Sequence, residues 1–184
     1  MKHSVAYNMS HRSLTIEKEK MKRWAYTIWI IMGAVMLFHS CSDTLVYDKY
    51  EHTPIAGWEK NDILSFDIPP LKTSGTYEQQ LGLRVTGVYP FMGLTLIVNQ
   101  SIFPKGKLQG MEKTEKSDTI QCDLIDKSGA TKGQGISYYQ YNFPINAYRF
   151  ASGDSIHITV KHNMKREILP GISDIGIKMN RIGE

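Results

Sequence analysis

Residues 153–164, GDSIHITVKHNM, carry the clearest β-strand pattern in the chain. Apolar Ile156, Ile158 and Val160 alternate with polar side chains, which predicts a strand with one buried face. His162 continues the apolar face, whereas His157 falls on the opposite one. The two imidazoles therefore cannot bind one metal ion on a regular strand, and we expect His162 to lie at the edge of the core.

The same alternation recurs outward from this stretch, between turns rich in Gly and Pro. It appears in residues 62–70, 81–85, 94–103, 118–126, 136–145 and 169–181. We find no internal repeat, and no amphipathic helical window follows Phe38. Seven or eight evenly spaced strands predict an all-β fold, as an antiparallel β-sandwich or barrel. We favour a jelly-roll-like sandwich, preceded by an N-terminal signal helix.

A bacterial lipoprotein signal peptide is the interpretation that best fits residues 21–43, MKRWAYTIWIIMGAVMLFHSCSD. Lys22 and Arg23 precede an uncharged apolar run that ends close to Cys41, the expected lipid acceptor. The alternatives are an uncleaved membrane anchor, for which the run is short, and a buried core helix. We predict a signal peptide over residues 1–40, with 1–20 as an over-long start, a lipidated tether over 41–53 and a β-sandwich domain over 54–184.

The charge and cysteine content of the chain narrow the range of functions that it can have. Residues 1–40 hold 6 of the 22 Lys and Arg but 2 of the 18 Asp and Glu, so 16 of each remain and the mature part is formally neutral. It has no long basic run, which argues against nucleic-acid binding. If Cys41 carries a lipid, Cys122 has no disulfide partner, and its alternating neighbours predict a small buried side chain.

No catalytic, metal or cofactor motif emerges from the mature part. The glycines of GATKGQG, residues 129–135, precede neither a Lys-Ser/Thr pair nor a predicted helix, so they do not form a phosphate-binding loop. The carboxylates are scattered, and a glycosidase pair is not singled out. We therefore expect neither a cofactor nor a metal site, and we predict that the chain is not an enzyme.

Two surface features remain as candidates. Trp58, Tyr138, Tyr139 and Tyr141 form a possible binding face, because aromatic side chains on a sandwich can stack on sugars or bind peptide; the alternative is that they simply fill strands and core. Three Asp-Ser/Thr-aliphatic tripeptides are similar to the O-glycosylation sequon of exported Bacteroidota proteins. Their acceptors would be Thr44, Thr119 and Ser155.

Four stretches together resemble one family, the gliding-motility lipoproteins called GldH, found in Bacteroidota. They are residues 46–69 with their Val-Tyr and Gly-Trp-Glu-Lys-Asn-Asp elements, 88–98 with Val-Tyr-Pro-Phe, 118–144 from Asp-Thr through Gly-Gln-Gly to YYQYNFP, and 162–179 with Leu-Pro-Gly-Ile-Ser-Asp-Ile-Gly. Their order and spacing cover almost the whole chain after Cys41. Lys165 stands where the family usually has Arg, and Arg166 follows it.

The resemblance implies a lipid-anchored protein of the cell envelope, with the outer membrane as its expected location. Such a protein belongs with the motility and surface-secretion machinery and has no known catalytic activity. Its partners would be the membrane and other envelope proteins, not nucleic acid. We therefore predict a lipoprotein that acts by protein–protein interaction. The alternatives are a glycan-binding surface lipoprotein and, without a supporting motif, a hydrolase.

Overall fold

Ten β-strands make up the described part of the domain. The computed structural model describes Trp24, residues 44–106 and residues 113–183, so Cys41 and the predicted signal peptide, apart from Trp24, lie outside the described residues. The strands are β1 (Leu45–His52), β2 (Trp58–Glu59), β3 (Leu64–Ile68), β4 (Gly75–Thr86), β5 (Gly93–Phe103), β6 (Thr114–Asp123), β7 (Tyr138–Phe150), β8 (Ser155–His162), β9 (Ile168–Leu169) and β10 (Ile172–Gly183). Within these described residues, no helix has the length and apolar character that a membrane crossing requires.

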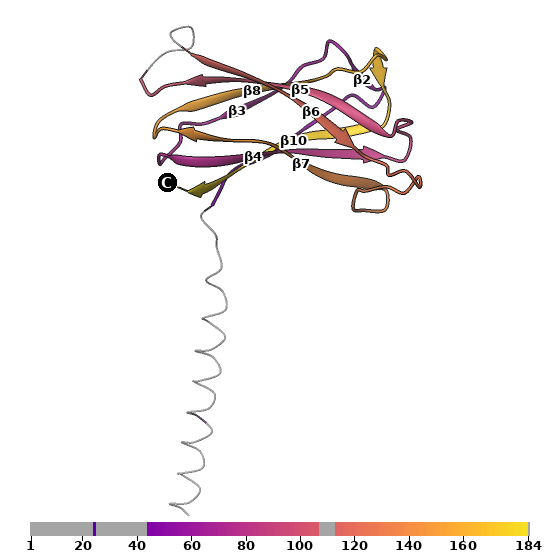
Figure 1. Ribbon diagram of the computed structural model, residues 1–184, viewed down its shortest axis with the longest axis horizontal. Helices are drawn as coiled ribbons and strands as arrows, with labels where there is room; N and C mark the ends of the chain where they lie inside the picture. The colour runs from indigo at the N-terminus through magenta and orange to yellow at the C-terminus, as the bar shows by residue number, and fades with distance from the viewer. Residues whose placement is uncertain (1–23, 25–43, 107–112, 184) are drawn as a thin grey trace, which may run out of the picture. The chain divides into compact units, whose positions relative to one another are not determined.

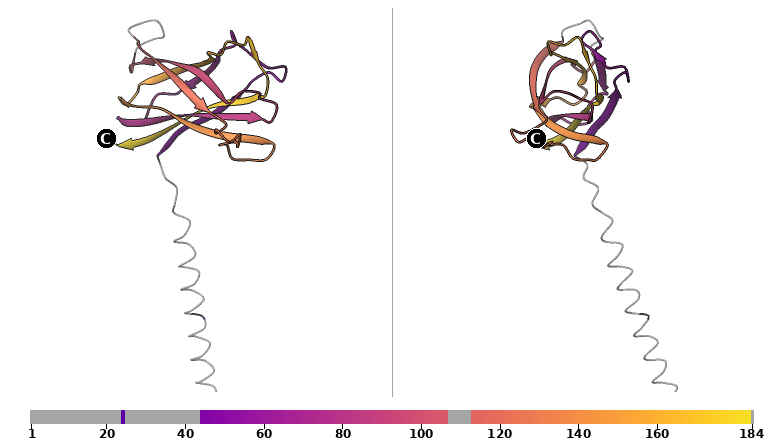
Figure 2. Two further views of the ribbon diagram at one scale, coloured as in Figure 1. Left: turned by 45° about the vertical axis from the view of Figure 1, so that its right-hand side comes forward. Right: turned by 90° about the vertical axis from the view of Figure 1, so that its right-hand side faces the viewer.

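Eight strands form two facing antiparallel sheets (Figure 1). One sheet has the order β1-β10-β4-β7 and the other β3-β8-β5-β6, while β2 and β9 pair separately at one end. This is the strand order of a jelly roll, in which neighbouring strands of one sheet come from distant parts of the chain. The end-on view in Figure 2 shows the two layers closing around a common interior. The predicted all-β antiparallel sandwich is confirmed.

Three boundaries differ from the sequence patterns. The segment predicted as a tether contributes an edge strand, because β1 pairs with β10 from Leu45 to His52. The strand expected from residue 118 begins earlier, because β6 starts at Thr114. The third difference is that β7 does not end near Pro144 but continues to Phe150. A proline is tolerated there because β7 is an edge strand and its pairing register with β4 shifts nearby.

Alternating apolar residues of both sheets fill the interior. Phe66, Leu83, Leu96, Ile158 and Ile177 are all fully buried. The pattern in β8 is as predicted, with every second residue from Ile156 to His162 buried. This interdigitation of two inner faces is what makes the half-buried strand pattern stable.

Cys122 belongs to this core. Its side chain is fully buried and its thiol is free. Burial raises the pKa of the thiol to about 12, and nearby Asp123 acts in the same direction. The predicted role as a small buried apolar residue is confirmed, because an un-ionised, inaccessible thiol is a poor nucleophile.

Tyr50 lies across the outer face of the first sheet. It pairs with Gly176 of β10, which in turn pairs with Gly82 of β4. A Cβ at Gly176 would come within 2.6 Å of the Tyr50 ring, and one at Gly82 would also clash with it. The two glycines therefore leave room for the ring to lie flat over three strands and cover their backbone.

Candidate interaction site

Exposed apolar side chains gather at one end of the sandwich, where β1, β4, β6 and β8 end. We call this end the rim and define it as residues 53–63, 87–92, 124–138 and 163–171; it lies at the right in Figure 1 and faces the viewer in the right-hand view of Figure 2. Its exposed large apolar residues are Ile55, Ile63, Val88, Met92, Ile136, Tyr138 and Ile168.

The clustering at the rim is not a general property of the described surface. Elsewhere in the described residues, the exposed large apolar side chains are Trp24, Leu45, Val46 and Ile182. Ile55 and Ile136 of the rim have exposed fractions of 105% and 93%, so their side chains contact almost nothing within the domain. Single exposed apolar residues are ordinary, but seven at one end make the rim the candidate interaction site of the described domain.

Backbone hydrogen bonds fix the rim segments to one another. Thr86 donates its N–H to the Gly171 carbonyl at 2.8 Å, which joins the loop after β4 to the turn before β10. Leu124 donates to the Met92 carbonyl at 2.9 Å, and Lys60 donates to the Glu167 carbonyl at 2.8 Å. A surface held in this way loses little conformational entropy on binding.

The Asp126 turn is tied down by its own side chain. Asp126 Oδ1 accepts hydrogen bonds from the Ser128 hydroxyl at 2.7 Å and from the backbone N–H groups of Ser128 and Ala130. These bonds favour the charged carboxylate and lower the pKa of Asp126, with the Ser128 hydroxyl as the largest cause. The turn is thus held in shape by bonds within itself.

Trp58 anchors the rim to the core. It is fully buried on β2, whose two residues pair with Leu169 and Ile168 of β9. The indole N–H donates to the Asp62 carbonyl at 3.0 Å. The ring meets the His162 imidazole edge-on, with centroids 5.2 Å apart. The Gly-Trp element is therefore structural, because it closes the core beneath the rim.

His162 makes the stability of this end depend on pH. Burial lowers its pKa below the ordinary 6.5, while the backbone of Trp58 acts in the opposite direction and the Lys60 charge adds to the lowering. The unfolded chain therefore binds this proton more readily than the folded protein. The stability contributed by the neutral ring is complete above pH 6.5 and is lost as the pH falls toward the lowered pKa.

We expect the urea midpoint to fall between pH 7.5 and 5.5, and to fall less in His162→Gln, which cannot titrate there. The difference between the two proteins isolates His162 from the carboxylates that also protonate in acid. Parallel pH dependence in both proteins would assign the effect to other groups.

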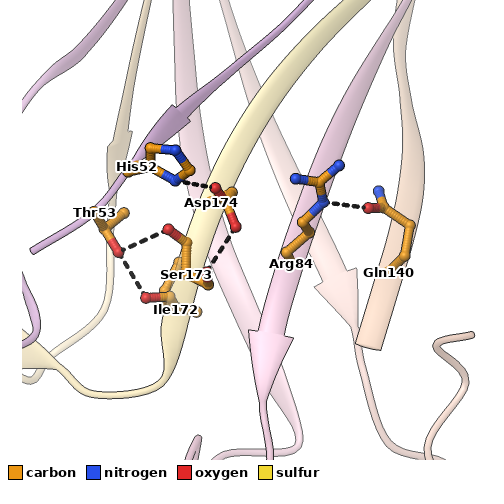
Figure 3. Close-up of polar contacts among 7 residues, drawn as sticks. All are labelled: His52, Thr53, Arg84, Gln140, Ile172, Ser173 and Asp174. Atoms are coloured by element: carbon orange, nitrogen blue, oxygen red, sulfur yellow. Dashed lines mark hydrogen bonds and ion pairs between the residues drawn. The ribbon is translucent and has the colours of Figure 1, made fainter. Parts of the chain in front are cut away.

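A row of polar side chains crosses the outer face of the first sheet next to the rim (Figure 3). Its members pair across four strands in the order His52, Asp174, Arg84 and Gln140. His52 Nδ1 contacts Asp174 Oδ1, and Arg84 Nε donates to Gln140 Oε1 at 3.0 Å. Asp174 is 4% exposed and also accepts a hydrogen bond from the Ser173 hydroxyl at 2.6 Å.

Tyr50, on the edge strand β1, contacts two members of this row. Gln140 Nε2 donates to the Tyr50 hydroxyl at 2.9 Å, and the Arg84 guanidinium carbon lies 4.2 Å above the centre of the Tyr50 ring. Thr53 extends the fixation into the rim, because its hydroxyl donates to the Ile172 carbonyl at 2.6 Å. The row therefore fastens β1 and the first rim segment to β10.

The His52–Asp174 pair has the form of a carboxylate that orients an imidazole. Ser173 donates to Asp174, and among the described residues no serine or cysteine hydrogen-bonds to His52. In residues 44–106 and 113–183, no three His, Cys, Asp or Glu side chains lie together as a metal site would require. His157, on the other face of β8, pairs with Asp67 at 2.7 Å.

The four aromatic residues of the predicted binding face do not share one exposure. Trp58 is buried, Tyr141 is 7% exposed, Tyr139 is half-buried and Tyr138 is 54% exposed. The Tyr141 hydroxyl shares a hydrogen bond of 2.6 Å with Thr131. Only Tyr138 presents most of a ring to solvent, so Trp58 and Tyr141 in this arrangement are unavailable for stacking on a sugar.

Tyr139 and Tyr141 instead line a pocket in the rim. The pocket has a volume of about 260 Å³ and lies between the loop after β4 and the segment after β6. Its walls include Val85, Phe91 and Leu124. The second and third family-like stretches therefore meet here, although they are separated in the sequence.

The predicted O-glycosylation acceptors lie on separate elements. Thr119 is exposed on β6, Ser155 is half-buried at the start of β8, and Thr44 is exposed just before β1. The Thr44 carbonyl accepts a hydrogen bond from Arg181 at 2.7 Å. Glycosylation of these hydroxyls stays a prediction, as does lipidation of Cys41.

Sequence reasoning missed the rim. Ile55, Val88, Met92 and Ile136 lie in short segments that contain Gly or Pro, a pattern that signals turns rather than a site. An apolar residue inside a turn segment is the one signal that could have drawn attention to them. Their shared location depends on strand topology, which local patterns do not contain.

Comparison with known proteins gives consistent relatives. The profile of the family described as GldH lipoprotein matches residues 45–179. A gliding motility lipoprotein GldH homolog of Christiangramia forsetii is 24% identical over 173 residues, covering 86% of this chain and 98% of that protein. The gliding motility lipoprotein GldH of Flavobacterium johnsoniae is 27% identical over 164 residues, covering 83% and 94%.

Solved structures give only distant likenesses. A protein of Sulfurospirillum deleyianum has a TM-score of 0.43 at 9% identity, covering 75% of this chain and 99% of that one. A carbohydrate-binding module specific for non-crystalline cellulose has a TM-score of 0.41 at 11% identity, covering 73% of each chain. Scores this low carry no functional argument. Because the family profile spans all but the last few residues of the described domain, the chain belongs to the GldH lipoprotein family.

Proposed function

We propose that this chain is a non-enzymatic lipoprotein of the cell envelope, of the gliding-motility and surface-secretion type, that acts by binding other proteins. The observation that carries the proposal is the rim, with its seven exposed apolar side chains on segments joined by backbone hydrogen bonds. Relatives of nearly the same length are named gliding motility lipoproteins. Apolar surface on a rigid support favours protein–protein association.

We further propose that Cys41 carries the lipid and that the anchor is in the outer membrane. The apolar run before Cys41 supports a cleaved lipoprotein signal. Thr44, where the described domain begins, follows Cys41 by three residues, so the tether spans at most about 10 Å. β1 then runs from its start toward the rim, which places the rim at the end of the domain opposite the tether's attachment.

Aspartate substitutions at the rim test the proposed function, because they place negative charge on its apolar surface. In a strain lacking the gene, the full chain carrying Val88→Asp and Ile136→Asp should fail to restore surface display of secreted proteins. The matched control, Leu45→Asp with Ile182→Asp, changes exposed apolar residues away from the rim and should restore display. Membrane recovery of both variants is compared with Cys41→Ala, for which we expect loss from the membrane fraction. Full display with the rim variant would refute the proposed function.

Glycan binding is the second candidate, and one observation favours it. A polar groove of about 500 Å³ next to Tyr141 is lined by Gln121, Asp123, Gln134, Asn142 and Phe143, among others. Amides and a carboxylate next to an aromatic ring can hydrogen-bond and stack on a sugar. Saturable oligosaccharide binding that is lost in Asn142→Ala would favour this function over protein binding.

A further inference from the structure

We propose that the rim pocket receives one large apolar side chain from a partner protein. This inference rests on the proposed function, because it names the anchor point of that interaction. The pocket volume of about 260 Å³ lies below the usual range for drug-sized ligands, about 300–1,000 Å³, and suits a single inserted side chain. Buried apolar or aromatic anchors of this kind carry much of the affinity of protein interfaces.

The chemistry of the pocket wall selects an apolar occupant. Besides its aliphatic and aromatic carbon surface, the wall has hydroxyl groups, but most of these are already engaged within the protein. Tyr89 donates to the Gly93 carbonyl at 2.9 Å, and Thr86 to the Gly171 carbonyl at 3.3 Å. Thr131 and Tyr141 bond to each other at 2.6 Å. Tyr141 in turn donates to the Leu124 carbonyl, so these four hydroxyl groups have no free proton to donate to a sugar.

Tyr139 has the remaining hydroxyl at the pocket, and it has no hydrogen-bond partner among the described residues. It is half-buried on β7. The hydroxyl can donate to one backbone carbonyl of the segment that carries the inserted side chain. One hydrogen bond beside an apolar socket fits a peptide segment and gives its register.

The described strand ends next to the undescribed residues lie away from the rim. They are Phe103 of β5, Thr114 of β6 and Gly183 of β10. With Cys41 as the lipidated start, three residues precede Thr44, whereas β4 or β10, with 12 residues each, spans about 40 Å. We therefore assign the occupant of the pocket to another molecule.

Two copies whose rims meet face to face do not fit the anchored geometry. Such a pair would place the two attachment points at opposite ends, and three residues span about 10 Å at most, so both lipids could not enter one membrane. The proposed occupant is a different protein, whose contacting segment carries an exposed Leu, Met, Phe or Trp next to a free backbone carbonyl.

Gly87 offers a way to plug the pocket without disturbing the fold. It lines the pocket, its φ is not in the left-handed region, and a Cβ built on it meets no atom within 4 Å. Gly183 also has open space around a Cβ and an ordinary φ, but it lies at the other end of the domain. Gly87→Leu and Gly183→Leu are therefore the same change at two ends.

The test uses the full lipidated chain in nanodiscs, with N-acetyl-tryptophanamide as the probe and methyl NMR as the readout. We expect saturable shifts at the methyl groups of Val85, Leu124 and Ile125. Gly87→Leu should weaken binding at least about tenfold, the change expected for the loss of one anchor contact. Gly183→Leu should leave it unchanged.

Three results would overturn the inference: no saturable shifts at these methyl groups, equal weakening in both variants, or shifts produced there by N-acetylglucosamine tetramer and not by the probe.

Failure of the pocket inference and failure of the proposed function give different results. If the rim variant Val88→Asp with Ile136→Asp abolishes surface display while Gly87→Leu binds the probe normally, the rim acts without the pocket. If that rim variant restores display, the proposed function itself is refuted.

Discussion

Replacing Trp58 with alanine should lower the free energy of unfolding by about 3–5 kcal/mol, the usual loss for a large buried aromatic side chain. Trp58 is fully buried and packs edge-on against His162. Removal of the ring leaves a cavity beneath the rim. It also removes the indole N–H that donates to the Asp62 carbonyl at 3.0 Å. Urea unfolding of the mature chain measures the loss.

Tyr138→Ala is the matched control for Trp58→Ala. Tyr138 belongs to the same predicted aromatic face but is 54% exposed, so its removal should change stability by no more than about 0.5 kcal/mol. The two aromatic residues thus separate a core role from a surface role. Equal losses from both substitutions would contradict the burial described for Trp58.

Gly171→Ala should destabilise the protein by about 2–4 kcal/mol, from the combined costs of a left-handed backbone and of overpacking. Gly171 has φ +81°, and a Cβ there would lie 2.5 Å from the backbone nitrogen of Tyr89 and 2.9 Å from its Cα. Backbone atoms cannot turn aside as a side chain can. The two rim segments would have to separate, and the hydrogen bond from Thr86 to Gly171 would weaken.

Gly87→Ala provides the comparison within the same end of the molecule. Its φ is ordinary and its surroundings are open, so alanine should be neutral or stabilise by about 0.4–1 kcal/mol through the unfolded chain. Thermal or urea unfolding of both variants measures the contrast. A loss of stability in Gly87→Ala as large as in Gly171→Ala would mean that this end tolerates no change of loop geometry, contrary to the structure.

Local patterns predicted the strands because the period of two is itself a local property. The alternating pattern predicted that Ile156, Ile158 and Val160 are buried, and it predicted the same for Cys122. Both predictions are confirmed. The patterns were weaker where a residue's setting depends on distant strands. Pro144 suggested an end to its strand, but an edge position in the sheet allows β7 to continue.

The aromatic residues show the same limit at the candidate site. Trp58 follows Gly57 and precedes a polar stretch that indicates a loop, yet pairing of β2 with β9 buries it. Tyr138 and Tyr141 are three residues apart on one strand, and therefore point to opposite faces. Whether a ring faces solvent or core depends on what the other sheet places opposite it, and sequence spacing does not contain that information.

Four properties could be predicted from the amino-acid sequence: the all-β class, the alternating core, the formal neutrality of residues 41–184 and the family. These properties depend on composition, periodicity and the order of short motifs, all of which can be read along one chain. Which turns meet depends on the folded arrangement of the strands. The jelly-roll order brings residues 53–63, 87–92, 124–138 and 163–171 to one end, because antiparallel strands return the chain to the same end at every second turn. Isolated apolar residues of four distant loops thus become one surface, and a surface of this kind exists only once the sheets have formed.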